Sequence, residues 1–184
     1  MCTLETNRLI LRMFSCDDWQ DLYEYLSQEE VVKYEPYDIY SQEECKIEAV
    51  NRSTNNAFWA ACLKENNKLI GNLYFQQLTP ENFMTWEIGY VFNPIFKEKG
   101  FATEACQRIL QYGFNQLGAH RIIGKCNPDN ISSWKLLERL SMRREGYFKQ
   151  PVFFKKTSEG KPIWHDAYQY AILSEEWFSK MSIL

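Results

Sequence analysis

The chain has 184 residues, of which 45% are hydrophobic and 16% aromatic, and a formal net charge of -3 at pH 7. This composition excludes a disordered chain and fits one sizeable core, so we expect a single domain over residues 1–184. The negative charge argues against a general nucleic-acid binder, and no apolar run reaches the length of a membrane span. Six scattered cysteines and only two histidines favour reduced thiols in a cytoplasmic protein over a zinc site.

The first predicted elements are a strand and two helices. Residues 8–14 alternate in polarity as a strand does. Ser15 and Ser41 each precede an acidic residue three positions later, a capping-box-like pattern that begins a helix. In the second of these helices we expect Ile47 and Val50 to face the core.

The segment 29–40 between these helices is rich in glutamate, aspartate and tyrosine. Together with the second helix, this segment contains seven acidic residues and two lysines, Lys33 and Lys46. The plainest interpretation is a solvated acidic face. The alternative is one wall of a site for a cationic acceptor, because an acidic cleft raises the local concentration of amines. Three tyrosines either line that wall or pack beneath a loop: Tyr34, Tyr37 and Tyr40.

Three strands and a helix make up the middle of the chain. Residues 57–64 and 68–78 predict a hairpin, in which Gly71 indicates a bulge or a close backbone approach. Residues 86–92 alternate as a third strand. From Ala102 onward the apolar residues recur at helical spacing, so a long helix follows.

The last third predicts a short strand over 122–126, a helix over 131–140, two strands over 144–154 and 164–173, and a terminal helix from Ser174. We expect the inward face of the 131–140 helix to be formed by Ile131, Trp134 and Leu137, with Leu136 as a further candidate. The whole order predicts a mixed α/β fold, in which helices flank a largely antiparallel sheet.

The turn 97–103 joins the third strand to the long helix. It places two lysines, a glycine and small residues where a helix begins. Free backbone N–H groups and the positive end of the helix dipole point into such a turn, which makes it a ready anion site. The plainer alternative is a simple connection with solvated lysines.

This turn resembles the pyrophosphate loop of the GNAT superfamily of N-acetyltransferases, which reads Arg/Gln-x-x-Gly-x-Gly/Ala. Lys97-x-x-Gly100-x-Ala102 fills that pattern. Within residues 87–105, the sequence pattern EIGY…NP…KGFATEA most resembles the ribosomal-protein N-terminal acetyltransferase (RimJ/RimL-like) branch. Lys97 stands where the family usually has Arg or Gln, and it still supplies charge and donors. Glu98 stands where the branch often has Gly, and its negative charge should weaken the anion site.

The resemblance implies acetyl-CoA as donor, a primary amine as acceptor, and direct attack in a ternary complex. It also implies that the end of the 86–92 strand splays from the 122–126 strand and pairs with the pantetheine arm. Asn130 would bond the same arm, or it caps a helix. The resemblance therefore assigns cofactor binding to Tyr90, Val91, Phe92, Lys97, Glu98, Lys99, Gly100, Phe101, Ala102, Thr103, Asn130 and Ser133.

Two residues are the catalytic candidates. Glu87 shares its strand face with Gly89, where the missing side chain leaves room, and exclusion of water would raise the pKa of Glu87 into the range of a useful base. The alternative is an ordinary solvated or ion-paired glutamate. Many GNAT enzymes use a tyrosine acid on the helix after Asn130, but Leu137 occupies that position here. The branch's proposed substitute is Ser133, which we expect to orient the sulfur unless it only caps the helix.

Two alternatives to this function stay open at the level of the sequence. One is a CoA-binding module without catalysis, which acts as a sensor or scaffold. The other is an acetyltransferase for a small molecule such as a polyamine, an amino acid or an antibiotic. The acidic segment suits polyamines as well as peptide N-termini, and a fold does not fix a substrate.

Overall fold

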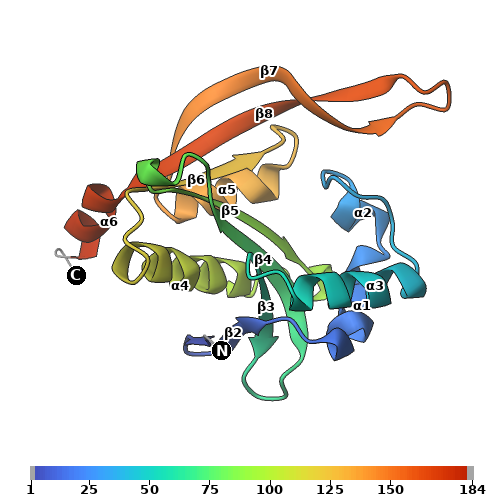
Figure 1. Ribbon diagram of the computed structural model, residues 1–184, viewed down its shortest axis with the longest axis horizontal. Coiled ribbons are helices and arrows are strands. Elements are labelled where there is room, and N and C mark those ends of the chain that lie inside the picture. The colour runs from blue at the N-terminus through green and yellow to red at the C-terminus, as the bar shows by residue number, and fades with distance from the viewer. Residues whose placement is uncertain (1–2, 182–184) are drawn as a thin grey trace.

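The structure is a computed structural model that describes residues 3–181 (Figure 1). Cys2 and both ends of the predicted domain lie outside the described residues. Within residues 3–181, one sheet of eight strands runs in the order β1-β2-β3-β4-β5-β6-β8-β7. The strands are β1 (Leu4–Glu5), β2 (Leu9–Met13), β3 (Phe58–Leu63), β4 (Leu69–Gln77), β5 (Thr85–Phe92), β6 (Arg121–Cys126), β7 (Arg143–Lys156) and β8 (Pro162–Leu173). Among the described strands only β5 and β6 pair in parallel, which confirms a mixed α/β fold with a largely antiparallel sheet.

Helices cover both faces of this sheet (Figure 1). They are α1 (Trp19–Leu26), α2 (Glu29–Val32), α3 (Gln42–Ser53), α4 (Phe101–Asn115), α5 (Ile131–Arg139) and α6 (Ser174–Met181). The larger core packs α4 and α5 against one face, where Ile88 of β5 lies. The smaller core packs α1 and α3 against the other face, where Val91 lies. No helix within the described range has the length and apolar character needed to cross a bilayer.

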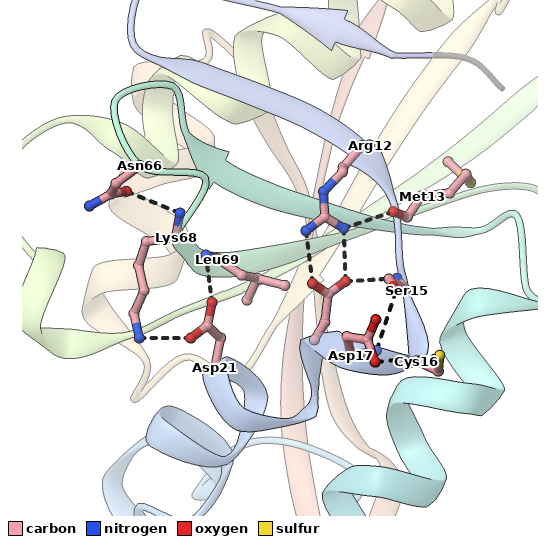
Figure 2. Close-up of polar contacts among 10 residues, drawn as sticks. Arg12, Met13, Ser15, Cys16, Asp17, Asp21, Asn66, Lys68 and Leu69 are labelled. Carbon is pink, nitrogen blue, oxygen red and sulfur yellow. Dashed lines mark hydrogen bonds and ion pairs between the residues drawn. The ribbon is translucent and has the colours of Figure 1, made fainter.

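Polar contacts fix α1 on its face of the sheet, as Figure 2 shows. Ser15 and Asp18 form the predicted capping box, and both Asp18 oxygens accept hydrogen bonds at 2.8 Å from the guanidinium of Arg12. Asp21 accepts from the Lys68 ammonium at 2.7 Å and from the Leu69 N–H at 2.8 Å. These contacts hold the start of the α1–α2 segment against β2 and β4.

The predicted inward faces of two helices are partly wrong. Ile47 and Val50 of α3 are 62% and 51% exposed. The buried stripe of α3 is instead Cys45, Ala49 and Arg52. The small side chains of Cys45 and Ala49 let α3 approach α1 closely. That helix–helix contact decides the rotation of α3 about its own axis. In α5, Ile131 is 55% exposed because it lies in the first turn, ahead of the packed Leu136 and Leu137.

Gly71 marks the close approach that the sequence predicts. The pairing of β3 with β4 shifts register between Ala61 and Cys62, where Gly71 is the partner of Ala61. A Cβ atom at Gly71 would lie 2.5 Å from the Phe92 ring. Only glycine therefore lets β4 support the end of β5, which is the end that opens into the site.

Candidate active site

A cavity of about 2010 Å³ opens at the end of β5. The parallel pairing with β6 runs from Thr85 and Arg121 to Ile88 and Gly124, and beyond Ile88 the strand pairs with β4 alone. This is the splay that the resemblance implies. Pockets for one small ligand usually measure about 300–1,000 Å³, so the cavity has room for two.

The structure places nearly all the predicted site residues along this cavity. Those that line it are Glu87, Tyr90, Val91, Phe92, Lys97, Glu98, Gly100, Phe101, Ala102, Thr103, Asn130 and Ser133. Lys99 is not among its lining residues. Its ammonium lies 5.5 Å from the centroid of the Phe96 ring, and its carbonyl accepts a hydrogen bond from Arg8. The Val91 side chain packs in the α1–α3 core, so Val91 offers the cavity its backbone.

The N-terminus of α4 fits an anion. Gly100 is the N-cap residue, at a φ of 80°, and it makes no side-chain capping bond. The first helical hydrogen bond runs from Glu104 N to Gly100 O at 3.0 Å, so the N–H groups of Phe101, Ala102 and Thr103 precede the ladder. Together with the helix dipole, these donors suit a diphosphate.

A group of contacts made by Thr6 and Arg8 supports this turn, and sequence reasoning missed it. We call these contacts the brace. Arg8 donates to the Lys99 carbonyl at 2.9 Å and pairs with Glu104 at 2.6 Å. Its guanidinium also lies 4.3 Å from the centroid of the Phe101 ring. Thr6 donates to the same Glu104 carboxylate at 2.6 Å. Local patterns gave no signal of this brace, because Arg8 and Glu104 lie 96 residues apart in the chain.

Asn130 and Ser133 are held in one turn at the start of α5. The side-chain Oδ1 of Asn130 accepts a hydrogen bond from Ser133 N at 3.2 Å, so Asn130 is the N-cap residue and Ser133 is not. The Tyr90 hydroxyl donates to the Ser133 carbonyl at 2.8 Å and lies 3.1 Å from Ser133 Oγ. Burial raises the pKa of Cys126 to about 11, and a hydrogen bond with Ser133 partly opposes that rise. Ser133 Oγ therefore sits in a defined polar contact beside the open strand end.

Leu137, at the position of the family's tyrosine acid, is not among the residues that line the cavity. Its side chain is 1% exposed. A Cβ atom at Gly124 of β6 would lie 2.7 Å from a Leu137 methyl group. Leu137 is therefore a packing residue between α5 and β6, whereas Ser133 and Tyr90 are among the hydroxyl-bearing residues that line the cavity.

Glu87 lies on the opposite side of the open strand end from the α4 turn. Its carboxylate is 3.4 Å from the Lys125 ammonium, and its side chain is 23% exposed. Gly89, which shares its face, also lines the cavity. Glu87 is thus a half-buried, ion-paired carboxylate that a ligand in the cavity can reach.

The acidic segment 29–40 fits both interpretations in part: some of its residues line the cavity, and others pack or pair elsewhere. Glu30, Tyr34 and Glu35 line the cavity. Tyr37 and Tyr40 pack together under the loop instead, with ring centroids 5.2 Å apart. Burial raises the pKa of Glu35 from 4.5 to about 7, although the charge of Arg52 and a hydrogen bond from Tyr37 oppose the rise. Three of the other acidic residues, Glu43, Glu44 and Glu48, form a cap and ion pairs on α3, so only part of the segment belongs to the site.

Comparison with known proteins identifies the fold and the family together. The profile of the family described as "Acetyltransferase (GNAT) domain" matches residues 8–143. The Bacillus subtilis protein named "Uncharacterized N-acetyltransferase YnaD" is 42% identical over 95% of this chain and 98% of its own length. The crystal structure of a GNAT-family acetyltransferase from Bacillus anthracis superposes with a TM-score of 0.87 and 36% identity, covering 95% of this chain and 100% of that one.

A more distant relative has a stated acceptor. The Escherichia coli [ribosomal protein uS5]-alanine N-acetyltransferase is 25% identical over 95% of this chain and 92% of its own length. The family match covers most of the chain, from β2 to the start of β7. The chain therefore belongs to the GNAT family of N-acetyltransferases, in the branch that includes the ribosomal-protein N-terminal acetyltransferases.

Proposed function

We propose that this protein transfers the acetyl group of acetyl-CoA to a primary amine by direct attack in a ternary complex. The observation that supports this most is the position of the cavity. At one end lie the uncapped amides of α4, at the other lies Glu87, and the unpaired edge of β5 runs between them. Donor and acceptor can therefore meet without a covalent enzyme intermediate.

Acetyl-CoA would supply an activated acyl group on a good leaving thiolate, whose solution pKa is about 8.5. The α4 turn would hold the diphosphate, and the backbone of Tyr90 to Phe92 would pair with the amides of the pantetheine arm. Gly100 lets the backbone approach phosphate oxygens closely. The side-chain Oδ1 of Asn130 is used on the α5 cap, and its amide N–H groups would serve as donors to the pantetheine arm.

Glu87 would take the proton that the acceptor ammonium has to lose. The neutral amine then forms a bond to the acyl carbon as the carbon–sulfur bond breaks, and the departing thiolate takes up the second proton that the nitrogen loses on becoming an amide. Ser133 Oγ would orient the sulfur. An α-amine with a pKa near about 8 needs less help than a lysine at about 10.4, so a chain N-terminus or a weakly basic small amine suits this site best.

A thiol-release assay with acetyl-CoA and a panel of amines tests this function. We expect CoA release that depends on the amine, together with heat on titration of acetyl-CoA in calorimetry. Heat without turnover on any amine would indicate a CoA-binding module instead. Acetylated enzyme trapped in the absence of an amine would contradict direct transfer.

A further inference from the structure

The acceptor end of the cavity has two walls of different chemistry. The first wall is formed by α2 and the loop that follows it, which contribute Glu30, Tyr34 and Glu35 to the lining of the cavity. The second is the β7–β8 hairpin, which extends beyond the other strands on the same side of the molecule as α2 (Figure 1). This hairpin wall presents Phe148, Val152 and Phe154 to the cavity.

The register of the hairpin accounts for its apolar face. Phe148 pairs with Ala167, and Val152 pairs with His165, so these side chains share one face of the ribbon. Phe154 stacks on His165 with ring centroids 5.9 Å apart. Phe148, Val152 and Phe154 are 46%, 39% and 41% exposed. Large apolar side chains gathered at a cavity in this way mark a surface that a ligand covers.

An ion pair joins the rims of the two walls. Lys155 Nζ of the hairpin lies 3.2 Å from Asp38 Oδ1 of the loop after α2. The Tyr34 hydroxyl donates to the Asp129 carbonyl at 3.4 Å and ties the first wall to the turn before α5. The acidic wall and the apolar wall therefore face each other across one space.

Negative charge is concentrated away from the hairpin. Among the described residues of the hairpin, Asp166 is the acidic side chain that lines the cavity. Its oxygens are already engaged: Oδ2 accepts from the Tyr147 hydroxyl and from Lys149 at 3.0 Å, and Oδ1 accepts from Gln150 N at 2.9 Å. A second ammonium group, such as the far end of a polyamine, would find no uncompensated carboxylate there.

We propose that the preferred acceptor is a primary amine that carries an apolar or aromatic group. Its amine lies on the side of Glu87 and Glu35, and its apolar group covers Phe148, Val152 and Phe154. This inference rests on the acetyl transfer proposed above and adds the substrate class. Both a peptide with an apolar first residue and a small arylalkylamine have this chemistry.

The test compares kcat/KM in the thiol-release assay for 2-phenylethylamine, ethylamine and spermidine, and for short peptides that begin with Phe or Gly. We expect the apolar member of each set to exceed the others by about tenfold or more, as an apolar pocket discriminates. The better of the two apolar acceptors identifies the source of the amine. Equal or higher kcat/KM for spermidine or the Gly peptide overturns the inference and leaves acetyl transfer standing. Absence of turnover with every amine overturns both.

Neighbouring phenylalanines provide the matched variants. Phe154→Ala should reduce the preference for the apolar acceptor at least fivefold while the KM for acetyl-CoA stays unchanged. Phe153 is equally exposed, at 41%, but it packs on Trp164 and does not line the cavity. Phe153→Ala should therefore keep the preference. An equal loss in the two variants, or no loss in Phe154→Ala, would contradict the assignment of the hairpin wall.

Discussion

The Glu87 carboxylate faces the cavity 3.4 Å from the Lys125 ammonium. If it accepts the proton of the acceptor, Glu87→Gln should lower kcat about 100-fold near pH 6 and far less near pH 9. At high pH the free amine is abundant without a base. A pH profile of kcat for both proteins measures this.

Glu65→Gln, in the exposed turn between β3 and β4, is the control and should keep the wild-type profile. A loss in Glu87→Gln of the same size at every pH would remove Glu87 as the base. It would point instead to a role in orienting the amine.

Glu98 adopts a left-handed backbone with a φ of 62°, where the branch often has glycine. Glu98→Gly relieves about 1 kcal/mol of strain, but glycine costs about 0.5–1 kcal/mol in chain entropy, so Tm should change little. Removing the charge beside the anion site should lower the KM for acetyl-CoA about threefold. Glu98→Gln removes the charge and keeps the strain, so it should lower KM equally. An unchanged KM in both variants would show that the charge is irrelevant.

Glu35 links stability to pH. Burial raises its pKa to about 7 from 4.5, so between these pH values the folded protein holds a proton that the unfolded chain releases. The free energy of unfolding should therefore fall by roughly 3 kcal/mol as pH rises from 4.5 through 7. Urea unfolding at pH 5 and pH 8 should show this fall in the wild type and a smaller one in Glu35→Gln. Identical falls in both proteins would contradict it.

Single residues were predictable where a local pattern carries the information. Gly100, Asn130 and Ser133 belong to motifs whose backbone geometry follows from nearby residues, and the structure puts them at the cavity. Lys99 belongs to the same motif, but its side chain turns to Phe96. Which way a long side chain points depends on tertiary neighbours that a motif does not record.

At the scale of elements, the brace from the Thr6–Arg8 turn before β2 to α4 positions the anion turn. Arg8→Ala should raise the KM for acetyl-CoA about fivefold and leave kcat nearly unchanged, because the turn loses its support while the amine site does not. Arg8→Lys should recover part of the loss. Arg8 is 47% exposed in its ion pair, so unfolding should change by less than about 1 kcal/mol.

The Lys46–Glu43 pair on α3 is a comparable exposed ion pair at 2.6 Å that lies away from the cavity. Lys46→Ala should leave both kinetic constants unchanged. If Arg8→Ala lowers kcat and leaves KM alone, the brace does not act through donor binding.

Helix existence was easier to predict than helix rotation. The capping boxes at Ser15 and Ser41 fixed where helices begin, because a cap involves neighbours in sequence. The rotation of α3 was wrong because its sequence carries two apolar stripes. Packing against α1 selected the one with Cys45 and Ala49, and it left Ile47 in solvent.

At the scale of the whole molecule, the cavity is lined by residues that range along the chain from Glu5 of β1 to Lys180 of α6. Acetyl-CoA binding should therefore stabilise the entire fold. At 100 times its Kd the donor should add about 2.7 kcal/mol to the free energy of unfolding, and Tm should rise with donor concentration. A Tm that does not respond to acetyl-CoA would contradict donor binding in this cavity.

The order of strands and helices was readable from periodicity, whereas their arrangement was not. Alternation predicted both final strands, yet nothing local indicated that β8 lies between β6 and β7. Nor did any local pattern indicate that the β7–β8 hairpin extends beyond the other strands and lines the cavity. Such pairings join residues far apart in sequence, and only the packed structure determines them.

The contact between Leu137 and Gly124 limits how this enzyme can be redesigned. A tyrosine placed at Leu137 to restore the acid common in the family is larger than leucine, so it would have to disrupt the close packing of this position on Gly124. Overpacking of this kind costs about 1–3 kcal/mol. Engineers who want a stronger proton donor near the sulfur should start from Ser133, which lines the cavity beside the open end of β5.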